Sequence, residues 1–171
     1  SLACLAVIRY CRFERKATLM ETVEPGCDLH QVENVEQAAR QAARLGNNIF
    51  LTIGSRGLGD FIRNLPESGL TVTARVLPDL KVMEKCLEMG LQPRNIIAMQ
   101  GPFSHELNLA MLRDCGAKVL VTKDSGREGG AAAKFSAAGE LRIPVVVIDR
   151  PKIEYSNMFS DFNGVLEFIK G

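Results

Sequence analysis

The sequence lacks tryptophan altogether, and only 6% of its residues are aromatic. It also lacks an excess of either charge, because 21 lysines and arginines oppose 20 aspartates and glutamates for a formal net charge of +1. Proteins that bind nucleic acid or an anionic membrane surface usually carry a strong basic patch, and base-stacking surfaces are built from aromatic side chains. These two shortages argue against nucleic acid and membrane partners.

Clustered metal ligands are missing as well. The sequence has five cysteines, none of them in a CxxC pair, and two histidines. Structural zinc sites need cysteine and histidine ligands at close spacing, so we predict no metal site. Scattered, unpaired cysteines are typical of reduced thiols, which favours a cytoplasmic protein.

No apolar run approaches the roughly 20 residues that a membrane-spanning helix needs. The apolar opening of the chain has no basic leader and continues directly into Arg9, a pattern unlike a signal peptide. It predicts instead a chain that begins partway through an α/β unit. A strand at residues 6–10 would then lack sheet neighbours, and its exposed edge favours self-association.

What the sequence does contain is an alternation of short apolar segments with amphipathic ones. The apolar, largely β-branched segments read as strands at residues 49–53, 71–77, 96–99, 118–122 and 144–148. Helical patterns occupy residues 32–45, 80–89, 105–114 behind a Ser104 cap, 130–140, and 161–170 behind a possible Ser160 cap. The alternation predicts an α/β fold with a Rossmann-like parallel sheet and helices on both of its faces.

A domain connection is expected within residues 16–30, which contain Pro25 and Gly26 and show little periodicity. We therefore interpret residues 1–47 as a remnant of an N-terminal α/β domain with its connection. Residues 48–171 would form the C-terminal Rossmann-like domain. Ligands of open α/β sheets bind outside the carboxyl ends of the strands, so the loops that follow the strands are candidate sites.

The loop after the first strand contains Gly54, Gly57 and Gly59. Its GxxGxG spacing differs from the GxGxxG fingerprint of dinucleotide-binding folds. Glycines still allow backbone N–H groups to face a phosphate, which makes Gly54 and Ser55 candidate phosphate ligands. The alternative for this motif alone is a tight turn without a ligand.

A second loop begins with Gly101 and Pro102, which predict a sharp turn after the third strand. Phe103 and Ser104 then lead into a helix whose first N–H groups can bind an anion. Asn108 lies one turn into that helix and is expected to face the same opening. A purely structural turn is the alternative.

The third loop is the densest in polar groups, since Lys123, Asp124, Ser125 and Gly126 follow the fourth strand. A lysine at a strand end, a small hydroxyl residue, glycines and a helix N-terminus together favour an anion pocket. The loop is not a P-loop, because its lysine precedes the glycines. The alternative is a flexible loop without a ligand.

Taken together, these segments resemble the precorrin-6A reductase family. The resemblance rests on TARVLP at residues 73–78, IIAMQGPFSHELN at 96–108, TKDSG at 122–126, the glycine pair at 129–130, the lysine–alanine helix at 134–138 and Arg-Pro at 150–151. It covers residues 7–151. Family members also carry a first strand with a glycine-rich turn and an Asp-x-Thr-His-Pro-type segment, which are not found here. The resemblance therefore implies a chain without its N-terminal portion.

The resemblance implies an enzyme of cobalamin (corrin) biosynthesis. A hydride would pass from NADPH, or NADH, to a double bond of precorrin-6A or its cobalt form, giving precorrin-6B. This tetrapyrrole carries many carboxylates, which basic residues and helix N-termini bind well. Cofactor contacts are expected from Gly54, Ser55, Arg75, Gly101, Pro102 and Phe103, with Arg75 suited to the 2′-phosphate of NADPH. Substrate contacts are expected from Arg9, Ser104, Asn108, Lys123, Asp124, Ser125 and Gly126.

Two other functions stay open at this point. The chain could be a non-catalytic nucleotide- or phosphate-binding module, or an oxidoreductase that acts on another small substrate. The sequence identifies no proton donor. It does not choose between NADPH and NADH or between the cobalt-containing and cobalt-free substrate, and it allows a homo-oligomer.

Overall fold

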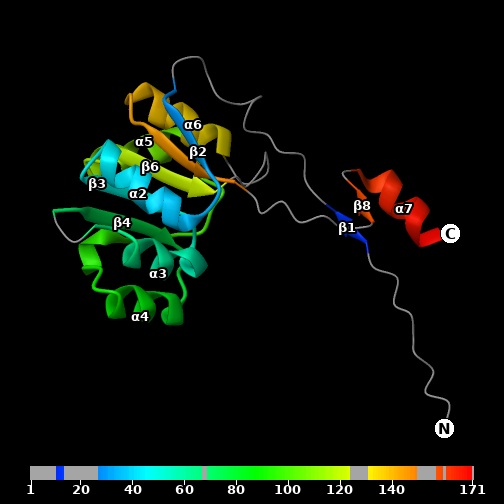
Figure 1. Ribbon diagram of the computed structural model, residues 1–171, viewed down its shortest axis with the longest axis horizontal. Helices are drawn as coiled ribbons and strands as arrows, with labels where there is room; N and C mark the ends of the chain where they lie inside the picture. Colours follow the sequence, from blue (N-terminus) through cyan, green and yellow to red (C-terminus); the bar gives the residue numbers. More distant parts are fainter. Residues whose placement is uncertain are drawn as a thin grey trace, which may run out of the picture. The chain divides into compact units, whose positions relative to one another are not determined.

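The computed structural model describes residues 11–13, 27–66, 69–123, 131–149, 157–159 and 161–170. The chain divides into two compact units, which are described separately (Figure 1). The larger unit is Thr18–Pro151, and the smaller one combines Ser1–Ala17 with Lys152–Gly171. None of the helices among the described residues is long and apolar enough to cross a membrane.

The larger unit contains a six-stranded sheet with the order β2-β7-β6-β3-β4-β5. Every neighbouring pair in it is parallel. The strands are β2 (Leu29–Val32), β3 (Asn48–Thr52), β4 (Thr71–Val76), β5 (Ile96–Ala98), β6 (Val119–Lys123) and β7 (Val145–Ile148). Read from β5, this is the Rossmann order, except that the sixth place is taken by β2, which precedes the other strands in the chain.

Helices cover both faces of this sheet, as the sequence predicted. On one face lie α2 (Val35–Leu45), α3 (Ser55–Arg63) and α4 (Leu80–Glu88), and on the other lie α5 (His105–Asp114) and α6 (Ala131–Glu140). A short 3₁₀ helix, η1 (Pro93–Asn95), precedes β5. Successive strand residues alternate between the two cores: Ile49 and Leu51 pack beneath α2 and α3, whereas Phe50 packs beneath α5 and α6.

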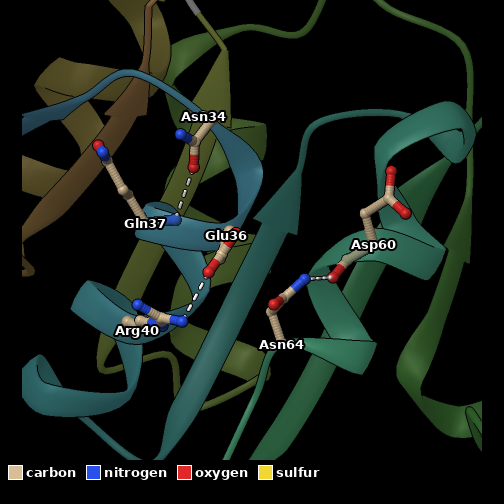
Figure 2. Close-up of polar contacts among 6 residues, drawn as sticks. All are labelled: Asn34, Glu36, Gln37, Arg40, Asp60 and Asn64. Atoms are coloured by element: carbon tan, nitrogen blue, oxygen red, sulfur yellow. Dashed lines mark hydrogen bonds and ion pairs between the residues drawn. The ribbon is translucent and has the colours of Figure 1, made fainter.

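Local signals in the sequence explain where several of these helices begin. The Asn34 side chain accepts a hydrogen bond from the Gln37 backbone N–H at 2.9 Å and so caps α2 (Figure 2). Ser104 caps α5 in the same way, through the Leu107 N–H at 3.2 Å, which confirms the predicted cap. After α5, Gly116 adopts a φ of 61°, a left-handed conformation that glycine accepts without strain.

The strand β2 was not among the predicted strands, and the expected boundary at residues 47 and 48 does not coincide with the division into units. β2 pairs with β7, from Leu29 opposite Val145 to Val32 opposite Ile148, so the sheet begins well before Asn48. Edge strands need little apolar sequence, and this one carries the polar pair His30 and Gln31. Its helix α2 is equally part of the sheet's core, where its fully buried residues are Ala38, Ala39 and Ala42.

The smaller unit joins segments from the two ends of the sequence. Its strands β1 (Arg12–Phe13) and β8 (Met158–Phe159) pair in parallel, and α7 (Phe162–Lys170) follows β8. The Phe159 and Phe168 rings lie 5.7 Å apart between centroids. Asp161 caps α7 by accepting from the Gly164 N–H at 2.9 Å, whereas the strand predicted at residues 6–10 and the predicted Ser160 cap lie outside the described residues.

Gly46 lies at the end of α2, where a side chain would meet β6. A Cβ there would stand 2.7 Å from the Lys118 Cβ and 3.0 Å from a Val119 methyl group. We expect Gly46→Ala to lower the free energy of unfolding by about 1–3 kcal/mol, because a Cβ fixed to the backbone cannot move aside.

The matched control is Gly139→Ala in α6, where a Cβ meets nothing within 4 Å. Helix propensity predicts a gain of about 0.5–1 kcal/mol for it. Urea denaturation measures both, and equal effects of the two substitutions would contradict this account.

Candidate functional site

The carboxyl ends of the six parallel strands meet at one edge of the sheet. The chain changes direction between β3 and β6, since β4 and β5 extend the sheet on one side of β3 and β6 and β7 on the other. Ligands of open α/β sheets bind at such a reversal, outside the carboxyl ends of the strands. Residues 54–59 follow β3, residues 101–104 follow β5 and Lys123 ends β6, so these predicted segments share this edge.

Arg75 is a buried cation near this edge that a hydrogen bond and two aromatic rings hold in place. It lies near the end of β4 with 8% of its surface exposed, and its Nη1 donates to the Asn108 Oδ1 at 2.8 Å. Its guanidinium carbon lies 4.1 Å from the centroid of the Phe103 ring, a cation–π contact, and 5.7 Å from that of Phe50. Burial lowers the pKa of Arg75 to about 10, which still leaves it charged at neutral pH.

Asn108 serves Arg75 rather than an open site. It is 1% exposed, and its Nδ2 donates to the Ser104 carbonyl oxygen at 2.7 Å, which fixes the amide with its oxygen toward Arg75. The sequence predicted that Asn108 faces the opening of the cleft. In the structure α5 turns this side chain into the core, because the buried guanidinium needs an acceptor there.

The turn at Gly101 and Pro102 places the Phe103 ring. A Cβ on Gly101 would lie 2.9 Å from the Phe103 Cε2, so the ring packs back against a position that only glycine leaves free. From there the ring covers the Arg75 guanidinium. Gly101 and Pro102 are themselves exposed at the edge of the sheet.

A second buried cation, Lys134, comes from α6. It is 7% exposed, and its Nζ donates to the Thr122 Oγ1 at 2.9 Å. Burial first, and the charge of Arg75 second, lower its pKa to about 8. Sequence reasoning placed Lys134 only in the family pattern and gave it no role. The signal that could have found it is its position among Ala131, Phe135 and Ala138, all buried on the core side of α6.

A polar row on the α5/α6 face connects these two cations. Thr52 of β3 pairs with Thr122 of β6. On the other side of β3, Leu51 pairs with Ala74 of β4. The next residues along these two parallel strands, Thr52 and Arg75, therefore lie beside each other. Thr122 is fully buried, whereas Thr52, in the middle of the row, is partly exposed.

Lys123 lies on the opposite face of the sheet, beside the start of α3. A Cβ on Gly57 would stand 3.6 Å from the Lys123 Nζ. Gly54, with a φ of 77°, occupies the N-cap position of α3 and makes no side-chain capping bond. The helix start carries a partial positive charge, so the ammonium and the first N–H groups of α3, including that of Ser55, together favour an anion.

Several predicted residues take no part in these contacts. Arg9, Asp124, Ser125 and Gly126 lie outside the described residues. His105, the first residue of α5, approaches Glu140 at 3.4 Å. The structure contains no group of three or more potential metal ligands among the residues that it describes, and the four cysteines within them are free.

Comparison with known proteins gives this geometry a context. The family description Precorrin-6x reductase CbiJ/CobK matches residues 1–170. The cobalt-precorrin-6A reductase of Priestia megaterium is 41% identical over 96% of this chain and 63% of its own length. That of Methanothermobacter thermautotrophicus is 39% identical over 94% of this chain and 52% of its own length. The chain thus spans between about half and two thirds of these curated relatives.

A solved structure described as CobK precorrin-6A reductase has the same fold. It superposes with a TM-score of 0.71 at 24% sequence identity, over 94% of this chain and 61% of that one. The likeness supports the arrangement of the parallel sheet and its helices.

Proposed function

Because this chain belongs to the precorrin-6x reductase CbiJ/CobK family, we propose that it reduces a double bond of precorrin-6A, or of its cobalt form, to give precorrin-6B. A reductase of this family implies a nicotinamide cofactor, which supplies the hydride when bound. The role left to this chain's residues is to bind and orient two anionic molecules, the cofactor and the tetrapyrrole. The proposal places this activity in the cytoplasm.

The observation that carries the proposal is a group of three lysine and arginine side chains near the carboxyl edge. Lys123 lies beside the α3 start, and Arg75 and Lys134 are buried nearby in the sheet's other face. The residues with which the described structure pairs these two buried cations are neutral. Cofactor phosphates and the acetate and propionate groups of a tetrapyrrole are the kind of ligand that this charge would bind.

The topology suggests which ligand lies where. In Rossmann-like sheets the diphosphate of a dinucleotide rests on the helix after the first strand, here α3 with Gly54 and Ser55. The ribose lies at the end of the next strand, where β4 carries Arg75 beneath Phe103. Lys123, with the adjoining Asp124, Ser125 and Gly126, would then meet carboxylates of the macrocycle. Ser104 and Asn108 act on the site through Arg75.

The smaller unit enters the same proposal. Among its described residues, the smaller unit has two short parallel strands and one helix. We propose that β1, β8 and α7 are part of a second α/β domain, and that Arg9 contributes to substrate binding.

Oxidation of the cofactor tests this function directly. The full chain is mixed with NADPH or NADH and with precorrin-6A or its cobalt form, and the loss of reduced nicotinamide absorbance is followed. We expect one equivalent of cofactor to be oxidised per macrocycle, and no oxidation without a macrocycle. A chain that binds the nucleotide but oxidises it with neither macrocycle would instead be a non-catalytic nucleotide-binding module.

A further inference from the structure

Two buried cations from different elements, Arg75 of β4 and Lys134 of α6, lie on one face of the sheet near its carboxyl edge. We propose that they form a single binding site for two negative charges carried on oxygen atoms, and that the ligand enters past Thr52. The identity of the ligand rests on the proposed function, but the site itself rests on the contacts described below.

Both cations keep unused hydrogen-bonding capacity among the described residues. An ammonium has three N–H donors and a guanidinium has five. Lys134 donates to the Thr122 hydroxyl, and Arg75 donates to the Asn108 amide oxygen and, at 3.9 Å, to the Met111 sulfur. Each of these partners is neutral. Buried charges are normally paired with opposite charges, so two buried cations whose partners among the described residues are neutral favour an anion as their ligand.

Thr52 is the partly exposed residue of the polar row. Thr52 lies between Arg75 and Thr122 along the polar row and is partly exposed, while both of its neighbours are buried. A group that enters past Thr52 would approach Arg75 from one side and the Lys134 ammonium, held on Thr122, from the other. This face is opposite the one that carries Lys123 and α3, so the site is separate from the anion position at the α3 start.

The surrounding residues fix the position of the Arg75 guanidinium before a ligand binds. The Phe103 ring contacts the Arg75 guanidinium, and Asn108 is itself anchored on the Ser104 carbonyl oxygen. A cation held before its ligand arrives loses little entropy on binding, which favours a specific contact.

The charge of the site limits what can fill it. A phosphate monoester carries about −1.5 to −2 at pH 7, and this balances one arginine and one lysine. Two neighbouring carboxylates on a tetrapyrrole would supply the same charge. Among the ligands of the proposed reaction, the first group is the 2′-phosphate, which NADPH carries and NADH lacks. The second is an acetate–propionate pair of the macrocycle.

The test compares Lys134→Met with the unchanged full chain, and Lys85→Met, an exposed lysine of α4, is the control. Inorganic phosphate is titrated against the midpoint of thermal unfolding, with chloride at matched ionic strength as the reference. We expect Lys134→Met to weaken phosphate binding about ten- to a hundredfold and Lys85→Met to leave it unchanged. Arg75→Lys keeps the charge but loses the guanidinium and its contact with Phe103, and should weaken phosphate binding without preventing folding.

Calorimetric titrations of Lys134→Met then identify the source of the charge. Weaker binding of NADPH with unchanged binding of NADH assigns the site to the 2′-phosphate, whereas weaker binding of precorrin-6A assigns it to the carboxylate pair. Unchanged affinity for phosphate, NADPH and precorrin-6A would overturn the proposal. Phosphate binding requires no turnover, so a chain that binds phosphate through Lys134 but oxidises no cofactor keeps this site and loses the proposed reaction.

Discussion

Replacement of Lys134 by methionine is expected to raise the free energy of unfolding by about 1–3 kcal/mol near pH 7, in the absence of ligand. Burial, with the nearby charge of Arg75, lowers the pKa of Lys134 from 10.5 to about 8. The folded protein therefore holds this ammonium at a cost that the unfolded chain does not have. Methionine keeps the length and apolar character of the stem and removes the charge, so the cost disappears.

The stability difference between Lys134→Met and the unchanged protein should depend on pH. Below about pH 8 the lysine is charged in both the folded and the unfolded chain, and the full cost is present. As the pH rises from about 8 to 10.5, the folded protein loses the proton before the unfolded chain does, and the unchanged protein gains stability relative to the variant. The advantage of Lys134→Met should therefore fade across this range. Arg75, with its pKa lowered to about 10, is the other described cation that faces Lys134.

Urea denaturation at pH 7 and at higher pH measures this difference, with Lys85→Met as the control for loss of an exposed lysine. A buried lysine that only supports the core through Thr122 would give the opposite sign. In that case Lys134→Met would unfold more easily at pH 7, and the interpretation of Lys134 as part of an anion site would be wrong. A charge that is kept for ligand binding can destabilise the folded protein. Its removal should then stabilise the protein and weaken ligand binding at the same time.

Strands that are buried on both faces were the part of the fold most open to prediction. β3, β4, β6 and β7 were located within a residue or two, because runs such as Val145–Ile148 are apolar at every position. β2 was not predicted, because an edge strand with His30 and Gln31 carries no such apolar run. Its pairing with β7 in the structure identifies it as a strand. The pairing of β1 with β8 could not be read from the sequence either, since it joins residues more than a hundred positions apart.

The candidate site was predictable in outline and not in its contacts. Parallel strands bring their following loops to one edge, so the loops themselves could be named from the sequence. Which face each cation occupies depends on strand parity and helix phase. The structure separates Lys123, beside α3, from Arg75, beneath α5. Lys134 was given no role because a lysine in an alanine-rich helix is usually exposed, and only packing against β6 buries it.

The anion position at the start of α3 has its own test in Lys123→Met. We expect this change to lower the affinity for the nicotinamide cofactor or for the macrocycle about ten- to a hundredfold, while folding is retained. The Lys123 Nζ lies beside α3, 3.6 Å from the position that a Cβ on Gly57 would take. The first N–H groups of α3 receive no side-chain cap. An anion bound there would receive a charge-assisted hydrogen bond and the field of the helix.

Lys118→Met is the matched control, because Lys118 is an exposed lysine that directly precedes the same strand, at the opposite edge of the sheet. Both variants lose one positive charge near β6, so a general effect of net charge on anionic ligands would weaken binding equally in the two. Titration of NADPH, NADH and precorrin-6A with each variant separates the local contact from that general effect. If Lys123→Met bound all three ligands as tightly as Lys118→Met does, the lysine would have no part in the site. A loss confined to the macrocycle would place a substrate carboxylate at the start of α3, and a loss shared by NADPH and NADH would place the cofactor diphosphate there.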